Sequence, residues 1–265
     1  MFENLKNMTP EEKATIVEHL EDLRKALLNS IIAIVVCAIA GFYFSDQILA
    51  FVQRPLDALG LKLIFIGVTE GFNIKLKLAF YGGLVLAFPV IAFQIYRFVA
   101  PALYPNERKY VLILVPVMVL LFAGGAIFAY SVILQLAITF LVMIAGDLEP
   151  MLTADKYISF FLRFTLPFGV VFELPVVVYF LTRLRIVTPQ WLAQKRKYAL
   201  LVIFILAAIL TPGGDVVSQC LMGIPVFILY ELSIWISKWS VPKDLDDWED
   251  DEDIEVSSNT NEPQE

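Results

Sequence analysis

Six long apolar runs determine what this chain can fold into. They lie at about 26–44, 78–96, 110–130, 157–181, 198–210 and 221–236. A helix of about 20 apolar residues crosses the roughly 30 Å hydrocarbon layer of a bilayer. AVILMFWYC residues make up 58% of the 265 positions, more than a soluble domain of this size covers with polar surface. The sequence therefore predicts an all-α polytopic membrane protein and excludes a soluble enzyme, a disordered chain and a disulfide scaffold.

A further apolar run at 132–145 raises the question of a seventh span. Joined to the run before it, it would make a helix of about 54 Å, too long for one crossing. With six spans and both termini in the cytoplasm, 14 of the 20 Lys and Arg residues lie inside, as the positive-inside rule requires. A seventh span would place the five basic residues of 183–197 outside. We therefore predict six transmembrane helices, N-in and C-in, and a helix at 132–145 lying on the outer side of the membrane.

The last two predicted spans are short. The run 198–210 gives only about 20 Å of helix, and Glu231 interrupts the run 221–236. Two adjacent short helices should thin the lipid beside them.

Three regions follow from the charge and hydropathy pattern. Residues 1–25 are predicted to form a cytoplasmic amphipathic helix, started by the capping box at 9–12, which turns into the first span. Residues 26–239 form the membrane domain. Residues 240–265 form a cytoplasmic acidic tail, with eleven acids and no Lys or Arg in 244–265. Such a block is typical of a disordered, self-repelling segment, and an interaction segment is the alternative.

Glu173 is the most unusual residue, because it lies in the middle of a span followed by Pro175. A carboxylate at that depth costs several kcal/mol unless it is protonated, paired or hydrated, and the proline bends the helix. The functional interpretation is a docking point or a proton site within the membrane. The alternative is a buried acid that a hydrogen bond keeps neutral or that pairs with Arg163. The spacing of about 15 Å along a helix disfavours the direct pair.

Other polar residues lie at the ends of the spans. Asp22 precedes the first span and Glu107 follows the second, each among basic residues. Both are candidates for a functional role, and the alternative is that each is an exposed acid that is only solvated. Thr211 and Asp215 lie in the predicted outer hairpin, where Asp215 or Ser218 would cap the next helix. Gln219 and Gln94 carry polar side chains within predicted spans, and such side chains often form hydrogen bonds between helices in a membrane.

The sequence holds no enzyme constellation. It has one histidine and two cysteines, which excludes an HExxH zinc site, and it lacks a Walker loop and a GxSxG motif. We therefore expect no enzymatic activity, no metal and no cofactor.

Several motifs in register carry a resemblance to a known family. They are 19–24 (HLEDLR), 54–56 (RPL), 98–104 (FVAPALY) with 107–108 (ER), 168–175 (FGVVFELP), 210–219 (LTPGGDVVSQ), 224–225 (IP) and 230–231 (YE). Together they resemble the TatC family, the polytopic core of the twin-arginine (Sec-independent) protein translocase, from about residue 17 to 239. Two departures are Asp22, where the family usually has Glu, and a turn at 211–215 that is one residue longer than the family's Thr-Pro-Pro-Asp.

The resemblance implies a receptor for the twin-arginine signal peptides of folded cargo proteins in the bacterial cytoplasmic membrane. It implies assembly with single-span TatA- and TatB-like proteins, a homo-oligomer within the complex, transport driven by the proton gradient, and no role for nucleic acid. The site residues it implies fall into three groups: signal-peptide contacts at Asp22, Arg24, Gln94 and Glu107; partner-helix contacts at Glu173, Thr211 and Gln219; and structural positions at Pro55, Pro101, Pro175 and Asp215. Fixed carboxylates suit this role, because bidentate Arg–carboxylate bonds are stronger than exposed ion pairs.

Two other classes of function remain open from the sequence. A proton- or ion-coupled secondary transporter would use Glu173 as its relay, but the sequence shows no internal repeat. An intramembrane hydrolase would need a nucleophile and a base that the motifs do not supply.

Overall fold

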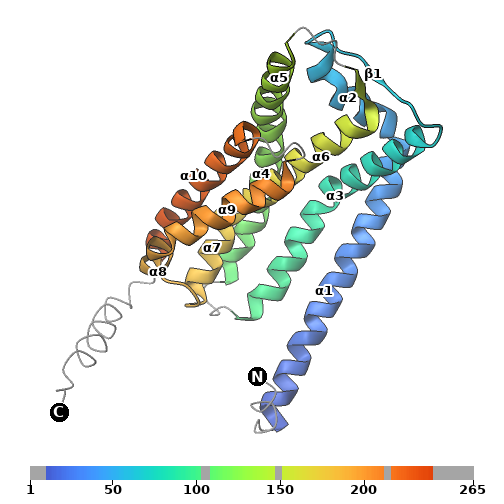
Figure 1. Cartoon of the computed structure of the whole chain (residues 1–265). Coiled ribbons are helices and arrows are strands. Elements are labelled where there is room, and N and C mark those ends of the chain that lie inside the picture. Colours follow the sequence, from blue (N-terminus) through green and yellow to red (C-terminus); the bar gives the residue numbers. More distant parts are fainter. Residues whose placement is uncertain (1–9, 103–107, 147–150, 212–215, 241–265) are drawn as a thin grey trace, which may run out of the picture.

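The computed structural model describes residues 10–102, 108–146, 151–211 and 216–240 and consists almost wholly of helices (Figure 1). The helices are α1 (Pro10–Tyr43), α2 (Ser45–Asp57), α3 (Glu70–Val99), a 3-10 turn (Ala100–Ala102), α4 (Arg108–Phe128), a π-helical turn (Ala129–Ile133), α5 (Leu134–Ala145), α6 (Ala154–Val171), α7 (Leu174–Arg183), α8 (Pro189–Gln194), α9 (Arg196–Leu210) and α10 (Val216–Ser240). Two-residue strands, β1 (Leu63–Ile64) and β2 (Leu152–Thr153), pair in parallel. The all-α prediction thus missed one short strand pair.

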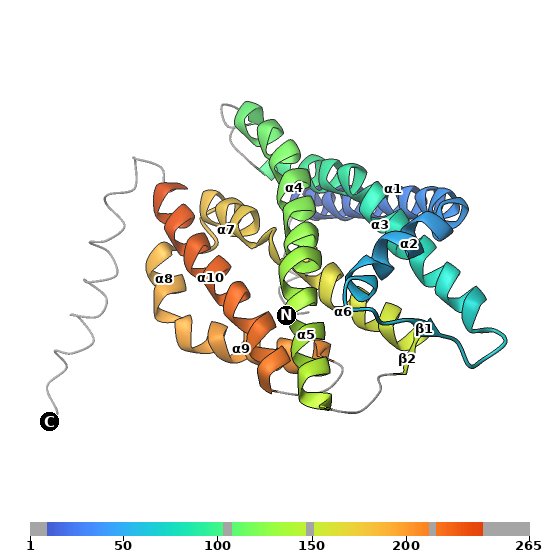
Figure 2. The ribbon, with the colours of Figure 1, turned by 90° about the horizontal axis from the view of Figure 1, so that it is seen from above.

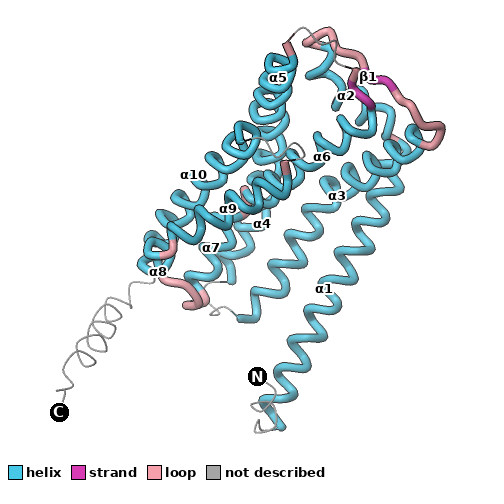
Figure 3. Tube along the Cα trace, viewed as in Figure 1, coloured by secondary structure: helices cyan, strands magenta, loops and turns pink. Residues whose placement is uncertain are grey.

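The loops gather at two ends of the molecule (Figure 3). The lower end in Figure 1 holds the start of α1, the end of α3, α8 and the end of α10. The upper end holds α2, the two strands and the end of α5. Seen from above, α1 and α3 lie at one side and α8, α9 and α10 at the other, with α4 and α6 between them (Figure 2).

Five stretches of helix in the described ranges are long and apolar enough to cross a membrane. They are His19–Tyr43, Glu70–Val99, Ile113–Ile144, Ala154–Arg183 and Val216–Ser240. These correspond to five of the six predicted spans. The remaining predicted span is α9, which at 15 residues covers only about 22 Å. The chain is therefore a multi-pass helical membrane protein with one unusually short helix beside α10.

The path of α1 differs from the expectation of a surface helix that turns into the first span. Between Pro10 and Tyr43, all of it described, α1 runs as one helix of 34 residues without that turn. From about His19 onward it packs antiparallel to α3 (Figure 1). Small residues allow this contact, since a Cβ atom on Gly83 would lie 2.5 Å from backbone atoms of Ala38.

The run at 132–145 was predicted as a helix on the outer side of the membrane. The structure has a helix there, α5, which continues α4 through the π-helical turn. Its place relative to the membrane stays a prediction. The i→i+5 hydrogen bonds of the π-helical turn let the helix pass from α4 to α5 without ending. Tyr130 in this turn donates a hydrogen bond to the carbonyl of Phe51 in α2, and Ala129 and Ile133 are buried.

The fourth predicted span is broken next to Pro175. Helix α6 ends at Val171, and α7 begins after Glu173 with Pro175 in its first turn. Pro175 cannot donate a backbone hydrogen bond, and in the first turn of a helix that donor is not needed. Pro167 lies inside α6 without ending it.

Candidate functional site

The lower half of α1 lies against the end of α3. The rings of His19 and Phe98 stack with their centroids 4.4 Å apart. Gln94 lies one turn before Phe98 on α3 and is half-buried. Pro101 is exposed in the 3-10 turn that follows. The stack therefore brings the motif at 19–24 next to the motif at 98–104, which are separate in the sequence.

The charged residues of this region differ in their partners. Asp22 is exposed and makes no hydrogen bond or ion pair within the described part of the chain. Arg24 lies 3.3 Å from the carboxylate of Glu21, one turn earlier on α1. Glu107 lies outside the described residues. The predicted convergence of Asp22 and Glu107 therefore stays a prediction.

Glu173 occupies the break between α6 and α7. Its side chain is 7% exposed, and neither carboxyl oxygen has a hydrogen-bond partner among the described residues. An acid so buried without a hydrogen-bond partner is costly, and such a group needs an explanation beyond simple packing. Whether Glu173 has a functional role stays a prediction.

Close helix packing surrounds the break. A Cβ atom on Gly125 of α4 would lie 2.7 Å from the carbonyl oxygen of Phe168, and one on Gly169 of α6 would lie 2.8 Å from the ring of Phe122. The two glycines let α4 and α6 approach closely, as small residues do in membrane helices. Little room therefore remains for Glu173 to turn toward a partner within α4.

Thr211 and Gln219 serve the hairpin of α9 and α10. The hydroxyl of Thr211 donates to the carbonyl of Ala207, 2.9 Å away. The amide of Gln219 donates across the hairpin to the carbonyl of Phe204, at 2.8 Å. Both polar groups therefore have acceptors inside this chain. Asp215 lies outside the described residues.

A bidentate ion pair joins the same two helices at the lower end. Arg196 at the start of α9 places Nε 2.7 Å and Nη2 3.0 Å from the two carboxyl oxygens of Glu231 in α10. Glu231, which interrupts the last apolar run, thereby gains a partner. Beside it, the Thr182 and Ser237 hydroxyls lie 2.7 Å apart and join α7 to α10.

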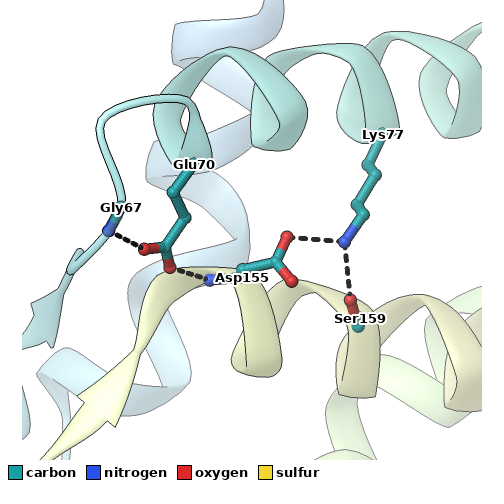
Figure 4. Close-up of polar contacts among 5 residues, drawn as sticks. All are labelled: Gly67, Glu70, Lys77, Asp155 and Ser159. Carbon is teal, nitrogen blue, oxygen red and sulfur yellow. Dashed lines mark hydrogen bonds and ion pairs between the residues drawn. The ribbon is translucent and has the colours of Figure 1, made fainter.

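Sequence reasoning missed a polar network at the upper end (Figure 4). Lys77 of α3 lies 2.5 Å from the carboxylate of Asp155 in α6 and 2.9 Å from the hydroxyl of Ser159. The carboxylate of Glu70 accepts hydrogen bonds from the backbone amides of Asp155, Ile66 and Gly67. The network ties the loop after β1 to the start of α6. The residues that it joins across α3 and α6 are 78 to 85 positions apart in the sequence, and no local pattern signals these contacts.

Two of the predicted structural prolines are buried in helices. Pro55 is buried inside α2, and Pro175 is buried at the start of α7. In the described ranges no group of three or more His, Cys, Asp or Glu side chains is arranged to hold a metal ion.

Comparison with known proteins identifies the family. A family model described as Sec-independent protein translocase protein (TatC) matches residues 18–225. The TatC protein of Carboxydothermus hydrogenoformans is 52% identical over 232 residues, which is 87% of this chain and 96% of that protein. The TatCy protein of Bacillus subtilis is 40% identical over 226 residues, 84% of this chain and 89% of that protein.

A solved structure shares the fold over almost its whole length. The crystal structure described as the twin-arginine translocase receptor TatC superposes with a TM-score of 0.78 at 38% identity, covering 84% of this chain and 99% of that one. The match includes both the α1–α3 motifs and the broken span around Glu173 within residues 18–225. The chain belongs to the TatC family of Sec-independent protein translocase proteins, a family of membrane transport components and not of enzymes.

Proposed function

We propose that this chain is the receptor subunit of a twin-arginine translocase and binds the signal peptides of folded cargo proteins. The observation that carries the proposal is the packing of the 19–24 motif against the end of α3, through the stack of His19 on Phe98. Asp22 lies about one turn after His19 on α1 and is exposed. A guanidinium pair needs two such carboxylates held at a fixed spacing.

The proposed topology puts the lower end in the cytoplasm. Basic residues of the described chain gather there, at Arg97, Arg183, Arg185 and in the 195–197 segment. This distribution is what the positive-inside rule requires of a cytoplasmic face. It supports six spans, with α9 counted as the short fifth one, and both termini in the cytoplasm of a bacterium. The regions 1–25, 26–239 and 240–265 then act as cytoplasmic helix, membrane domain and cytoplasmic tail.

Glu173 supports a role in assembly. A buried acid without a described partner offers a hydrogen bond to a polar group on an arriving helix, and polar contacts of this kind join helices in membranes. The proposed partners are single-span TatA- and TatB-like proteins, and the same complex would contain further copies of this chain. Transport would draw on the proton gradient. The competing role for Glu173 is the proton relay of a secondary transporter.

Photocrosslinking with the intact protein in membrane vesicles tests the receptor role. A signal peptide with an arginine pair is compared with the same peptide carrying two lysines, which keeps the charge and removes the bidentate fork. A photoreactive residue at Gln94 should capture the arginine peptide and little of the lysine peptide. The control position is Phe65, an exposed residue at the upper end, which should capture neither. Equal capture of both peptides at Gln94, or none, would reject the receptor role.

A further inference from the structure

Arg163 is a charged residue on the outer face of an apolar span. It lies in α6, within the membrane-spanning stretch Ala154–Arg183. Its side chain is exposed, and it makes no hydrogen bond or ion pair with any described residue. A charged side chain inside a span is costly, so such residues usually serve a ligand or a partner.

The carboxylates near the start of α6 are engaged elsewhere. Asp155 is the only acid of α6, and it pairs with Lys77 of α3 (Figure 4). Glu70 of α3 accepts hydrogen bonds from three backbone amides. Glu173, the next acid along the chain, is ten residues from Arg163, about 15 Å along a helix. The guanidinium of Arg163 therefore has no counter-charge within the described chain.

The depth of Arg163 follows from the length of its span. The 30 residues of Ala154–Arg183 form about 45 Å of helix, which exceeds the roughly 30 Å hydrocarbon layer by about 15 Å. Arg163 lies nine residues after Ala154, about 13.5 Å from the upper end. It therefore lies at the upper edge of the layer or within its upper half.

The direction of the side chain favours the upper surface. Helix α6 begins at the upper end, directly after β2 (Figure 1), and Cα–Cβ bonds tilt toward the start of a helix. Lys156, Arg163 and Val170 follow each other at intervals of seven residues, and all three are exposed. They form one stripe along α6, since seven residues make two helical turns. Arg163 can therefore extend its guanidinium toward the headgroups.

The short helix α9 ends at the same depth. Ala207 and Leu210, in the last turn of α9, belong to the same packed cluster of side chains as Phe164, the residue after Arg163. Because α9 is too short for the bilayer, the lipid beside it thins. Thinning at the end of α9 brings the headgroups of that leaflet toward Arg163.

We propose that Arg163 binds the phosphodiester of an acidic phospholipid, in the leaflet at the upper end. The guanidinium fork matches two phosphate oxygens, and one phosphodiester charge neutralises it. Lys156 lies about 10 Å closer to the surface, on the headgroup side of the stripe. The acyl chains would then lie over Val170, on the opposite side of Arg163. The site does not depend on the proposed receptor function.

A carboxylate on a partner helix is the competing occupant of the same face. The lipid is favoured because bilayer lipid contacts an exposed face of a span at all times. The depth of Arg163 also matches the level at which α9 ends. A test on the chain without partner proteins therefore separates the two.

The test is fluorescence quenching by brominated lipids in vesicles that contain the full chain alone. A bimane fluorophore is attached at Val170→Cys, which is on the stripe, in a chain with Cys37→Ala and Cys220→Ala. Phosphatidylcholine vesicles carry a small share of phosphatidylglycerol with brominated chains, and matched vesicles carry the bromine on phosphatidylcholine instead. We expect phosphatidylglycerol to occupy the site about tenfold more readily, the effect of one hydrogen bond to a charged group.

Three variants locate the contact. Arg163→Gln should abolish the preference, while quenching by brominated phosphatidylcholine stays unchanged and shows that the face still contacts lipid. Arg163→Lys keeps the charge without the fork, so an intermediate preference is expected. The control is Arg54→Gln, which removes an exposed arginine of α2 at the same end and should keep the full preference.

Four results would overturn the proposal. Equal quenching by both lipids in the chain with Arg163 intact would leave a partner helix as the occupant. A preference that survives Arg163→Gln would place the lipid site elsewhere. An equal loss in Arg54→Gln would reduce the effect to net charge. Loss of the preference when inorganic phosphate is added in excess would assign the site to free phosphate. Since no signal peptide is present, these outcomes are independent of the receptor function.

Discussion

The imidazole ring of His19 lies on the ring of Phe98, with 4.4 Å between the ring centroids. This contact joins two motifs that are about 80 residues apart in the sequence. Stacked aromatic pairs contribute about 0.5–1.5 kcal/mol beyond the area that they bury. The contact is thus strong enough to help align α1 with the end of α3, but the long packing of the two helices does most of the positioning.

Gly83 should be essential to that packing. A Cβ atom there would lie 2.5 Å from the backbone of Ala38, so Gly83→Ala must push α1 away from α3. We expect thermal unfolding in detergent to show a loss of about 1–3 kcal/mol, with weaker signal-peptide binding. Gly124→Ala is the matched control, because open space surrounds it and alanine favours the helix by about 0.5–1 kcal/mol. Equal stability of the two variants would contradict the close approach.

The ion pair between Lys77 and Asp155 should contribute modestly to the upper end. The two side chains are 37% and 40% exposed, so solvent screens them, and such pairs contribute about 0.2–1 kcal/mol. Lys77→Met and Asp155→Asn should each lower the unfolding temperature slightly. In a double-mutant cycle the double variant should be less destabilised than the sum of the single variants. Strict additivity would show that the pair adds no stability.

The sequence predicted the helical spans well because their signal is local. Length and hydropathy located the five long spans, and Pro175 indicated the break at Glu173. The continuity of α4 and α5 was missed, since a π-helical turn has no simple pattern in an apolar run. The continuity of α1 from Pro10 was missed for a related reason. The sequence changes from polar to apolar along α1, but the helix continues through that change.

The contacts between elements were mostly beyond the sequence. Gln219 was recognised as polar within the membrane, yet only the fold shows that it donates to the carbonyl of Phe204. Lys77 was counted as an outer charge, and its partner Asp155 is 78 residues away. Such pairings depend on tertiary packing, which hydropathy and spacing do not encode.

Gln219→Leu should weaken the α9–α10 hairpin. The substitution removes the hydrogen bond to Phe204, and interhelical hydrogen bonds in membranes contribute about 0.6 kcal/mol, with a maximum near 1.7. Chemical unfolding in mixed micelles should detect the loss. Gln135→Leu is the control, because Gln135 is exposed on α5 and should leave stability unchanged. If Gln219→Leu keeps full stability but loses crosslinks to a TatB-like helix, its role is docking alone.

Glu173 should distinguish docking from proton transfer. Glu173→Gln keeps the size and the capacity to donate a hydrogen bond, so a docking role predicts that much of the assembly and transport survives. Glu173→Ala should lose both while the protein still inserts into the membrane. A relay role instead predicts that both variants are inactive, since glutamine cannot carry the proton. Transport assays at matched expression decide between them, and full activity of both would remove Glu173 from the mechanism.

The affinity of a twin-arginine signal peptide for the purified protein tests the receptor role most directly. Asp22→Ala and Glu107→Ala should each weaken binding by about 1.5–3 kcal/mol, the scale of a hydrogen bond to a charged group, measured by calorimetry in nanodiscs. Asp22→Glu keeps the carboxylate and should bind like the unmodified chain, which controls for a general loss of structure. Unchanged affinity in the double alanine variant would contradict the assignment of these two carboxylates as the arginine site.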